Sequence, residues 1–152
     1  MQEEQTQRGE PIEWKDPGLR GKLGAPMRRI VSARGEMWIW WRPGMRAFVT
    51  AATGHGTAEL GTPFLAELEK ASALGACEVW DDWSRITSYE AALRVQITDW
   101  TRARPELAKN CHILVGSKLI AMGLSVANML LGGVMDVRSD RAAFERALTA
   151  VL

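Results

Sequence analysis

Polar side chains that could take part in chemistry gather in one stretch of the chain, between Asp81 and Ser88. Two adjacent aspartates, Asp81 and Asp82, are followed by the hydroxyls of Ser84, Thr87 and Ser88. A hydroxyl becomes a nucleophile when a neighbouring base takes its proton, and no histidine lies close to these residues in sequence. Successive residues of a strand point to opposite faces, so the two aspartates cannot share one metal ion while the strand continues. The stretch therefore predicts no catalytic residue and no metal site, and we expect that the protein is not an enzyme.

Basic residues follow two neighbouring predicted strands and could converge on the same rim. They are Lys118 and Arg138. Together with the aspartates they are enough for a salt-bridge network. Such networks are more often structural than catalytic, although the two look alike. Around Gly54, His55 and Gly56 neither of the glycine-rich phosphate-binding patterns can be completed. With no CxxC motif or Cys/His cluster present, the sequence predicts no cofactor.

The elements around the aspartates are predicted by an apolar run and a capping pattern. Cys77, Val79 and Trp80 form a run that stops at the double aspartate, as a buried strand does when it enters a loop. Thr87 and Glu90 have the spacing of a capping box, so we expect a helix to begin there and Thr87→Ala to cost about 1 kcal/mol. A loop at a strand's carboxyl end, beside a positive helix N-terminus, is a common place for a site. The predicted interaction surface consists of Asp81, Asp82, Trp83, Arg85, Thr87, Ser88 and Lys118.

Phosphorylation of Ser88 offers a switch that needs no chemistry from the protein itself. In the predicted helix a phosphate on Ser88 lies in the first turn, where the macrodipole favours negative charge and Arg85 is near in sequence. Asp81 and Asp82 oppose it by like-charge repulsion. The expected result is a surface around Trp83 that turns acidic and changes its affinity for a protein partner.

Alternating strands and helices follow from the remaining patterns, with no internal repeat. The predicted strands cover residues 30–31, 37–41, 47–50, 77–80, 111–115 and 134–137. The predicted helices run from Thr62 to Gly75, from Thr87 to Pro105, from Ser117 to Gly132, and onward from Ser139. His112, at the start of an otherwise apolar strand, is interpreted as a hydrogen-bonded core or strand-edge residue rather than a ligand.

The helix from Ser117 to Gly132 is apolar on nearly every face. It is too short and too often interrupted for a convincing membrane span. A helix of this kind is buried in the fold or at an interface, and an exposed patch on it would favour a two-fold homodimer.

Tryptophans in the predicted hairpin leave two alternatives for its faces. Trp38 and Trp40 share one face, while Met37, Ile39 and Trp41 share the other. Either helices cover both faces, which we favour, or one face meets a ligand. The candidate residues for an apolar pocket are Trp38, Trp40 and Trp80. A closed core beneath these tryptophans favours an interaction module, whereas an apolar pocket of several hundred Å³ favours a ligand carrier.

Composition sets the outer limits. At 152 residues we expect one domain over residues 27–152, preceded by a flexible tail over residues 1–26 that is rich in Gln, Glu, Arg, Gly and Pro. Nineteen basic and eighteen acidic residues leave a net charge of +1, which gives no electrostatic reason to expect nucleic acid. Cys77 and Cys111 fall in predicted strands and are interpreted as buried thiols. The polar first residues lack a signal peptide's apolar core, so we expect the cytoplasm.

Three segments resemble the SpoIIAA-like fold of STAS domains and of the related STAS/SEC14-like bacterial proteins. They are EVWDDWSRITSYEAAL, CHILVGSKLIAMGLSVANML and VRSDRAAFERAL, and the resemblance covers about residues 29–152. It implies an α/β fold with a mixed sheet of five or six strands, a leading β-meander and four helices. It also implies a regulatory or protein-interaction role or, from the SEC14-like relatives, a carrier of an apolar or lipid-like ligand. No glycine follows the hydroxyls of Thr87 and Ser88, unlike the compact Asp-Ser-Ser-Gly motif of the phosphorylated antagonists.

Overall fold

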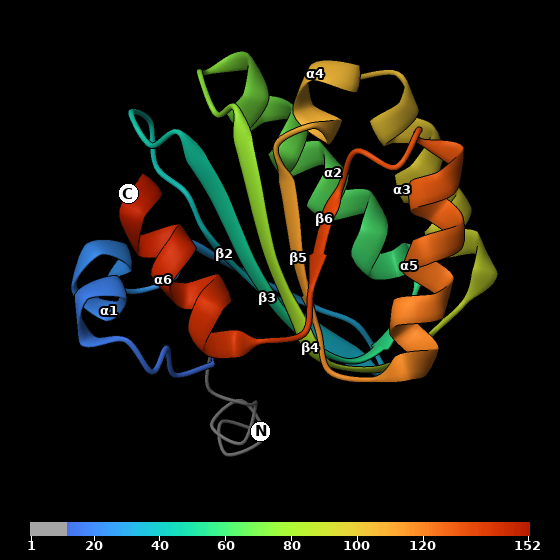
Figure 1. Cartoon of the computed structure of the whole chain (residues 1–152), viewed down its shortest axis with the longest axis horizontal. Helices are drawn as coiled ribbons and strands as arrows, with labels where there is room; N and C mark the ends of the chain where they lie inside the picture. The colour runs from blue at the N-terminus through green and yellow to red at the C-terminus, as the bar shows by residue number, and fades with distance from the viewer. Residues whose placement is uncertain (1–11) are drawn as a thin grey trace, which may run out of the picture.

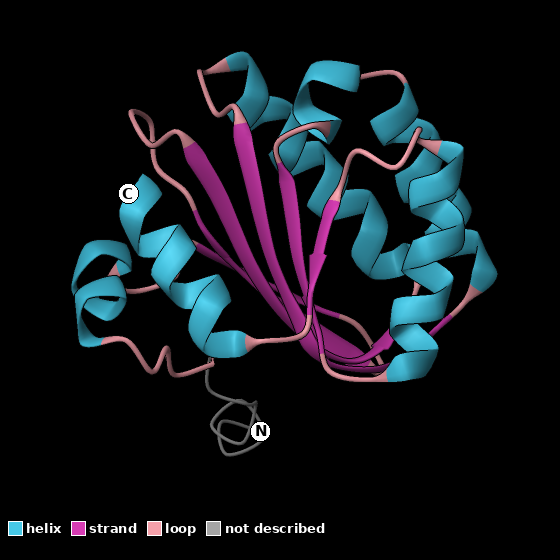
Figure 2. Cartoon of the chain, in the orientation of Figure 1, coloured by secondary structure: helices cyan, strands magenta, loops and turns pink. Residues whose placement is uncertain are grey.

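A single six-stranded sheet forms the centre of the computed structural model, which describes residues 12–152 (Figures 1 and 2). The strands lie in the order in which they occur in the chain: β1 (Arg28–Val31), β2 (Gly35–Trp40), β3 (Ala47–Gly56), β4 (Glu78–Tyr89), β5 (Cys111–Val115) and β6 (Asp136–Arg138). Strands β1 to β3 are antiparallel neighbours, and β3 to β6 are parallel neighbours. The predicted mixed sheet with a leading meander is therefore confirmed.

Helices cover both faces of this sheet (Figure 1). The helices in residues 12–152 are α1 (Pro17–Leu23), α2 (Ala58–Ala73), α3 (Ala91–Arg102), α4 (Pro105–Ala108), α5 (Lys118–Leu130) and α6 (Arg141–Val151). Connections between adjacent parallel strands are right-handed, so α2, α3 and α5, which connect successive pairs, cover the same face. Helices α1 and α6 cover the other face (Figure 1).

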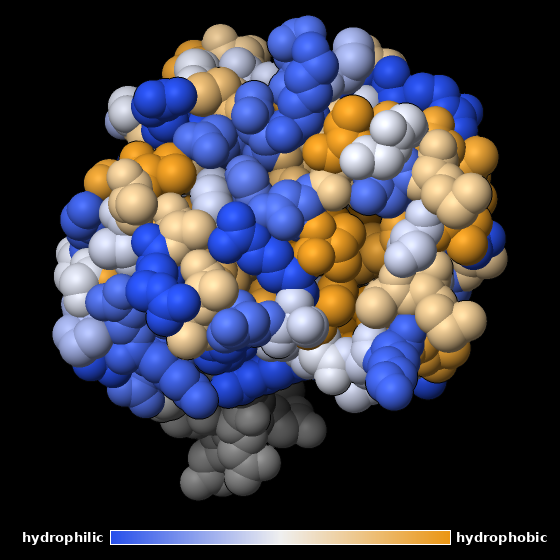
Figure 3. Space-filling view, viewed as in Figure 1, coloured by the Kyte–Doolittle hydropathy of each residue, from blue (hydrophilic) through white to orange (hydrophobic). Residues whose placement is uncertain are grey.

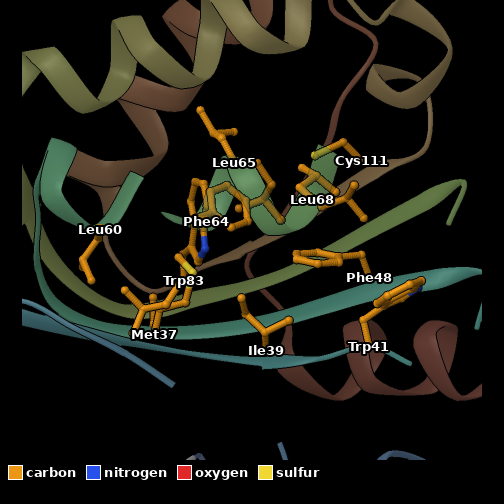
Figure 4. Packing of buried hydrophobic residues seen from close by; sticks show 14 of the residues in the cluster. Met37, Ile39, Trp41, Phe48, Leu60, Phe64, Leu65, Leu68, Trp83 and Cys111 are labelled. Carbon is orange, nitrogen blue, oxygen red and sulfur yellow. The ribbon is translucent and has the colours of Figure 1, made fainter. Parts of the chain in front are cut away.

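The two faces carry separate hydrophobic cores. Met37, Ile39 and Trp41 point toward α2 and belong to the first core, whose packing is seen in Figure 4. Trp38 and Trp40 belong to the second core, between the sheet and helices α1 and α6. The period-2 alternation predicted for β2 is confirmed, and all five of these side chains are buried.

The segment before β1 differs from its prediction. Residues 1–11 of the predicted tail lie outside the described residues, but residues 12–26 are folded and complete the second core. Ile12, Trp14, Leu19 and Leu23 are buried there, and the Trp40 indole donates to the carbonyl oxygen of Gly24 over 3.1 Å. These apolar residues are too widely spaced to predict packing without knowledge of α6, which contributes Phe144 and Leu148 to the same core.

Several helix boundaries also differ from the sequence prediction. Helix α2 begins at Ala58, with Thr57 rather than Thr62 at the N-cap position and Pro63 inside the helix. Asp140, not Ser139, caps α6 by accepting a hydrogen bond from the backbone N–H of Ala143. The prediction for α5 is confirmed, because Ser117 is its N-cap and accepts from the backbone N–H of Ile120.

Two further sequence predictions need correction. Pro105, predicted to end a helix, begins the short helix α4. Cys111 is buried as predicted, but Cys77 lies just before β4 and is exposed.

The largest correction concerns β4, which continues for 12 residues to Tyr89. Helix α3 begins only at Ala91, so Thr87 is not its N-cap and its hydroxyl donates to the carbonyl oxygen of Gly54 instead. Glu90 is the N-cap residue of α3, but its side chain forms no cap hydrogen bond there; its carboxylate instead accepts from the backbone N–H of Ala58 at the start of α2. The strand is long because β3 stays paired with it as far as Tyr89. Two register shifts in this pairing let the backbone hydrogen bonds continue past the polar residues.

The caps predict different costs for two alanine substitutions. Ser117→Ala removes the N-cap hydrogen bond of α5 and is expected to cost about 1 kcal/mol in the free energy of unfolding. Thr87→Ala removes only an exposed strand-end hydrogen bond and is expected to cost less than about 0.5 kcal/mol. Urea denaturation of both variants measures the difference. Equal losses would contradict this assignment of the caps.

Candidate functional site

The residues predicted to form a rim after β4 lie largely inside the protein. Asp81, Asp82 and Trp83 are only 2%, 0% and 7% exposed. The two carboxylates do point to opposite faces, as predicted. Asp81 accepts a hydrogen bond of 2.6 Å from the hydroxyl of Thr50, and Asp82 meets Arg141 on the other face. An interaction surface centred on Asp81–Trp83 is therefore not available at the surface.

Asp82 belongs to a network that connects β4, α6 and the N-terminal segment. The Arg141 guanidinium donates through Nη2 to Asp82 over 2.7 Å and to the Ser84 hydroxyl over 2.8 Å. Its other nitrogen, Nη1, donates to Glu145, which in turn accepts from the backbone N–H of Asp16. Burial alone would lower the pKa of Arg141, but the Asp82 carboxylate raises it above its ordinary value. The network is structural, because it satisfies a fully buried carboxylate.

The basic residues predicted to converge on the rim do not meet there. Lys118 is exposed in the first turn of α5, and Arg138 pairs with Asp136 at 2.7 Å. Arg141, which does reach Asp82, was missed because it lies 59 positions further along the chain.

The carboxyl end of β4 places Ser88 beside a histidine that sequence proximity did not reveal. The parallel pairing of β3 and β4 aligns His55 with Ser88, and the Ser88 hydroxyl lies 2.6 Å from His55 Nδ1. Within residues 12–152 no carboxylate is hydrogen-bonded to this imidazole, so the pair lacks the third group that orients the base in hydrolases. Because Ser88 lies in a strand, a phosphate on it would not occupy the first turn of a helix, as the sequence had predicted. Arg85 and Thr87 are exposed neighbours on the same strand.

His112 lies in a polar cluster where β5 and β6 begin. Its imidazole stacks on Trp80 with ring centroids 3.9 Å apart, and Nδ1 is 2.8 Å from Asp136. Burial alone would raise the pKa of Asp136, but hydrogen bonds from His112 and Arg138 hold it below its ordinary value. The interpretation of His112 as a hydrogen-bonded strand residue is confirmed. Among residues 12–152, no three His, Cys, Asp or Glu side chains are grouped to hold a metal ion.

A cavity of about 90 Å³ lies in the first core, between the sheet and helices α2, α3 and α5. Trp83 and Asp81 line it, whereas the candidate pocket residues Trp38, Trp40 and Trp80 are buried in the second core on the opposite face. Burial raises the pKa of Asp81 to about 7, against the hydrogen bond from Thr50, which lowers it. The cavity is smaller than the pocket of several hundred Å³ that would favour a carrier, and the core beneath the tryptophans is closed.

Helix α5 carries the clearest surface feature. Only Ile120 and Ala127 of this apolar helix are buried. Its outer face exposes a stripe, here called the α5 seam, whose side chains are 50% to 78% exposed: Leu119, Met122, Val126, Met129 and Leu130. Apolar surface gathers over α5 and between α5 and β6 in Figure 3. Of the helices in the described part of the chain, none is both long and apolar enough to cross a bilayer.

Comparisons with known proteins bear on the fold. No protein-family model and no curated protein matches the sequence significantly. A solved structure that resembles the chain is an uncharacterized protein of the DUF3478 family from Shewanella loihica PV-4, described as having a SpoIIAA-like fold. The two share 17% sequence identity and superpose with a TM-score of 0.55 over 80% of this chain and 99% of the other. The SpoIIAA-like fold expected from the sequence is thus confirmed, and this likeness shows the fold alone.

Proposed function

We propose that this SpoIIAA-like domain is a non-enzymatic regulatory module that acts by protein interaction, and that its contact surface is the α5 seam. The observation that carries the proposal is the exposure of large apolar side chains, each at least half accessible, along one helix. Soluble monomers rarely expose contiguous apolar patches beyond a few hundred Å² without a binding role. The buried positions of Asp81, Asp82 and Trp83 move the proposed surface away from the rim predicted by the sequence.

The spacing of the seam fits a helix as its partner. Leu119, Met122, Val126 and Met129 are separated by three, four and three residues, the spacing of a coiled-coil seam. Over these residues α5 extends about 15 Å, so the contact is a short one of three helical turns. Two such faces together bury on the order of 1,000 Å², at the low end for specific interfaces.

A second copy of the chain is the occupant that we propose. The three-four-three spacing reads the same in both directions, so two antiparallel α5 helices place Leu119 opposite Met129 and Met122 opposite Val126. Lys118 is the only charged residue of α5 and lies at the positive N-terminal end of its own helix. Antiparallel pairing brings it to the negative C-terminal end of the other copy's helix. A two-fold contact therefore covers the α5 seam and places each Lys118 ammonium near a helix end of opposite charge.

Acidic substitution in the seam tests the proposal. We expect sedimentation equilibrium to show a concentration-dependent dimer for the wild type and a monomer for the Met122→Glu/Val126→Glu variant, because two carboxylates cannot be buried without partners. Leu74→Glu is the matched control, since Leu74 is also more than half exposed but lies after α2. It should leave the dimer unchanged.

Cysteine cross-linking tests the orientation of the two helices. In chains that also carry Cys77→Ser, which removes the exposed native thiol, a mixture of Leu119→Cys and Met129→Cys chains should form the mixed disulfide in preference to either homodimer. A wild type that remains monomeric at several hundred micromolar, or a dimer that persists in the acidic double variant, would refute the α5 interface.

A further inference from the structure

The cavity beneath α5 contains a buried acid that no basic side chain neutralises. Asp81 is 2% exposed, and within residues 12–152 no Lys, Arg or His nitrogen lies within 4 Å of its carboxylate. Thr50 donates to Oδ1, and no described residue donates to Oδ2. Buried charges in proteins are normally paired, so a carboxylate in this position has an unused capacity for a cation. Asp82, the next residue of the strand, differs in that Arg141 neutralises its carboxylate.

The walls around Asp81 are apolar and partly aromatic. Phe64 and Trp83, whose rings meet edge to face at 6.2 Å, line the cavity together with Tyr89 and Trp100. Aromatic faces attract organic cations. Besides Asp81, the titratable or charged residues that line the cavity are Tyr89 on β4, Arg94 on α3 and Cys111 on β5, while the residues contributed by α2 and α5 carry no charge. Arg94 lines the cavity but is exposed to solvent, and it forms no ion pair within residues 12–152.

We propose that this cavity binds a small primary amine whose ammonium group pairs with Asp81 and whose short alkyl group fills the space between the sheet, α3 and α5. The volume of about 90 Å³ is smaller than that of an apolar cavity of about 150 Å³ that holds benzene, so a small ligand fits and a phospholipid does not. The ammonium group donates to the free Oδ2, and the alkyl group contacts Ile97, Leu124 and Ala127. This site lies on the inner side of α5 and is independent of the proposed dimer, which uses the outer side.

Isobutylamine and its neutral isostere isobutanol separate the charge from the apolar fit. At pH 8, titration of the full chain followed by NMR chemical shifts should show saturable binding of isobutylamine by the wild type. Isobutanol should bind more weakly by at least about tenfold, the ratio that corresponds to one pKa unit of differential interaction. In Asp81→Asn the preference for the amine should disappear, so that both probes bind equally weakly.

A cavity-filling variant checks the location. Ala127→Leu is expected to abolish amine binding because it fills the cavity, whereas Val95→Leu, on the exposed face of α3, should leave it unchanged. Equal affinity for amine and alcohol in the wild type would overturn the proposal, and so would amine binding that survives both Asp81→Asn and Ala127→Leu. Absence of amine binding by the folded wild type would overturn it as well.

Discussion

Replacing Asp81 with asparagine is expected to make the protein more stable than the wild type above pH 7 and to remove much of the pH dependence of its stability. Burial raises the pKa of Asp81 to about 7 in the folded state, from an ordinary value of 3.8. The folded state therefore holds a proton that the unfolded state releases. The resulting stabilisation is fully present below about pH 4 and is lost as the pH rises through 7.

The size of this effect follows from the same two values. A shift from 3.8 to about 7 corresponds to at most about 4 kcal/mol between pH 4 and pH 8. Asparagine keeps an oxygen that accepts from Thr50 but cannot ionise. Urea denaturation at pH 5 and pH 8 should show the wild type losing stability relative to Asp81→Asn. Asp99→Asn, at an exposed position on α3, is the control, and curves for Asp81→Asn that run parallel to the wild type would contradict the prediction.

Arg141→Met is expected to cost about 3 to 5 kcal/mol, because it leaves the fully buried carboxylate of Asp82 without its partner. The side chain of methionine keeps most of the apolar contacts of the arginine stem, so the loss reports mainly the missing charge. Arg146→Met, on the exposed side of the same helix, should change the free energy of unfolding by less than about 0.5 kcal/mol.

A double variant separates charge burial from packing in this network. Asp82→Leu combined with Arg141→Met removes both charges and should recover part of the stability lost in Arg141→Met alone. Chemical denaturation of the four chains gives the coupling free energy. Equal costs for Arg141→Met and Arg146→Met would show that the Asp82 pair does not stabilise the fold.

Elements with regular local patterns could be predicted from the sequence. The alternation in β2, the continuous apolar run of β5 and the Ser117 cap of α5 each depend on neighbouring residues, and each is found in the structure. The order of strands and helices limits the arrangement to few topologies, and the resemblance to STAS domains identified the SpoIIAA-like fold among them.

The candidate site was harder to predict because its contacts are distant in sequence. The polar end of β4 extends as a strand only because β3 lies beside it, and the same pairing joins His55 to Ser88. Asp82 is buried because Arg141 neutralises it, and neither residue alone signals this. For α5, the apolar composition predicted burial either in the fold or at an interface. Which face stays exposed depends on how the helix packs over the sheet, and the sequence does not show this.

The second core has a consequence for the time course of synthesis. Trp38 and Trp40 are synthesised early. Helix α6, which covers them together with the N-terminal segment, begins only at Arg141. At ribosomal rates the hundred residues between them take roughly 5 to 20 seconds to add, during which this aromatic face of the nascent sheet has no cover from α6. The tryptophan-rich face of the sheet therefore lacks its α6 cover until nearly all of the domain has been translated.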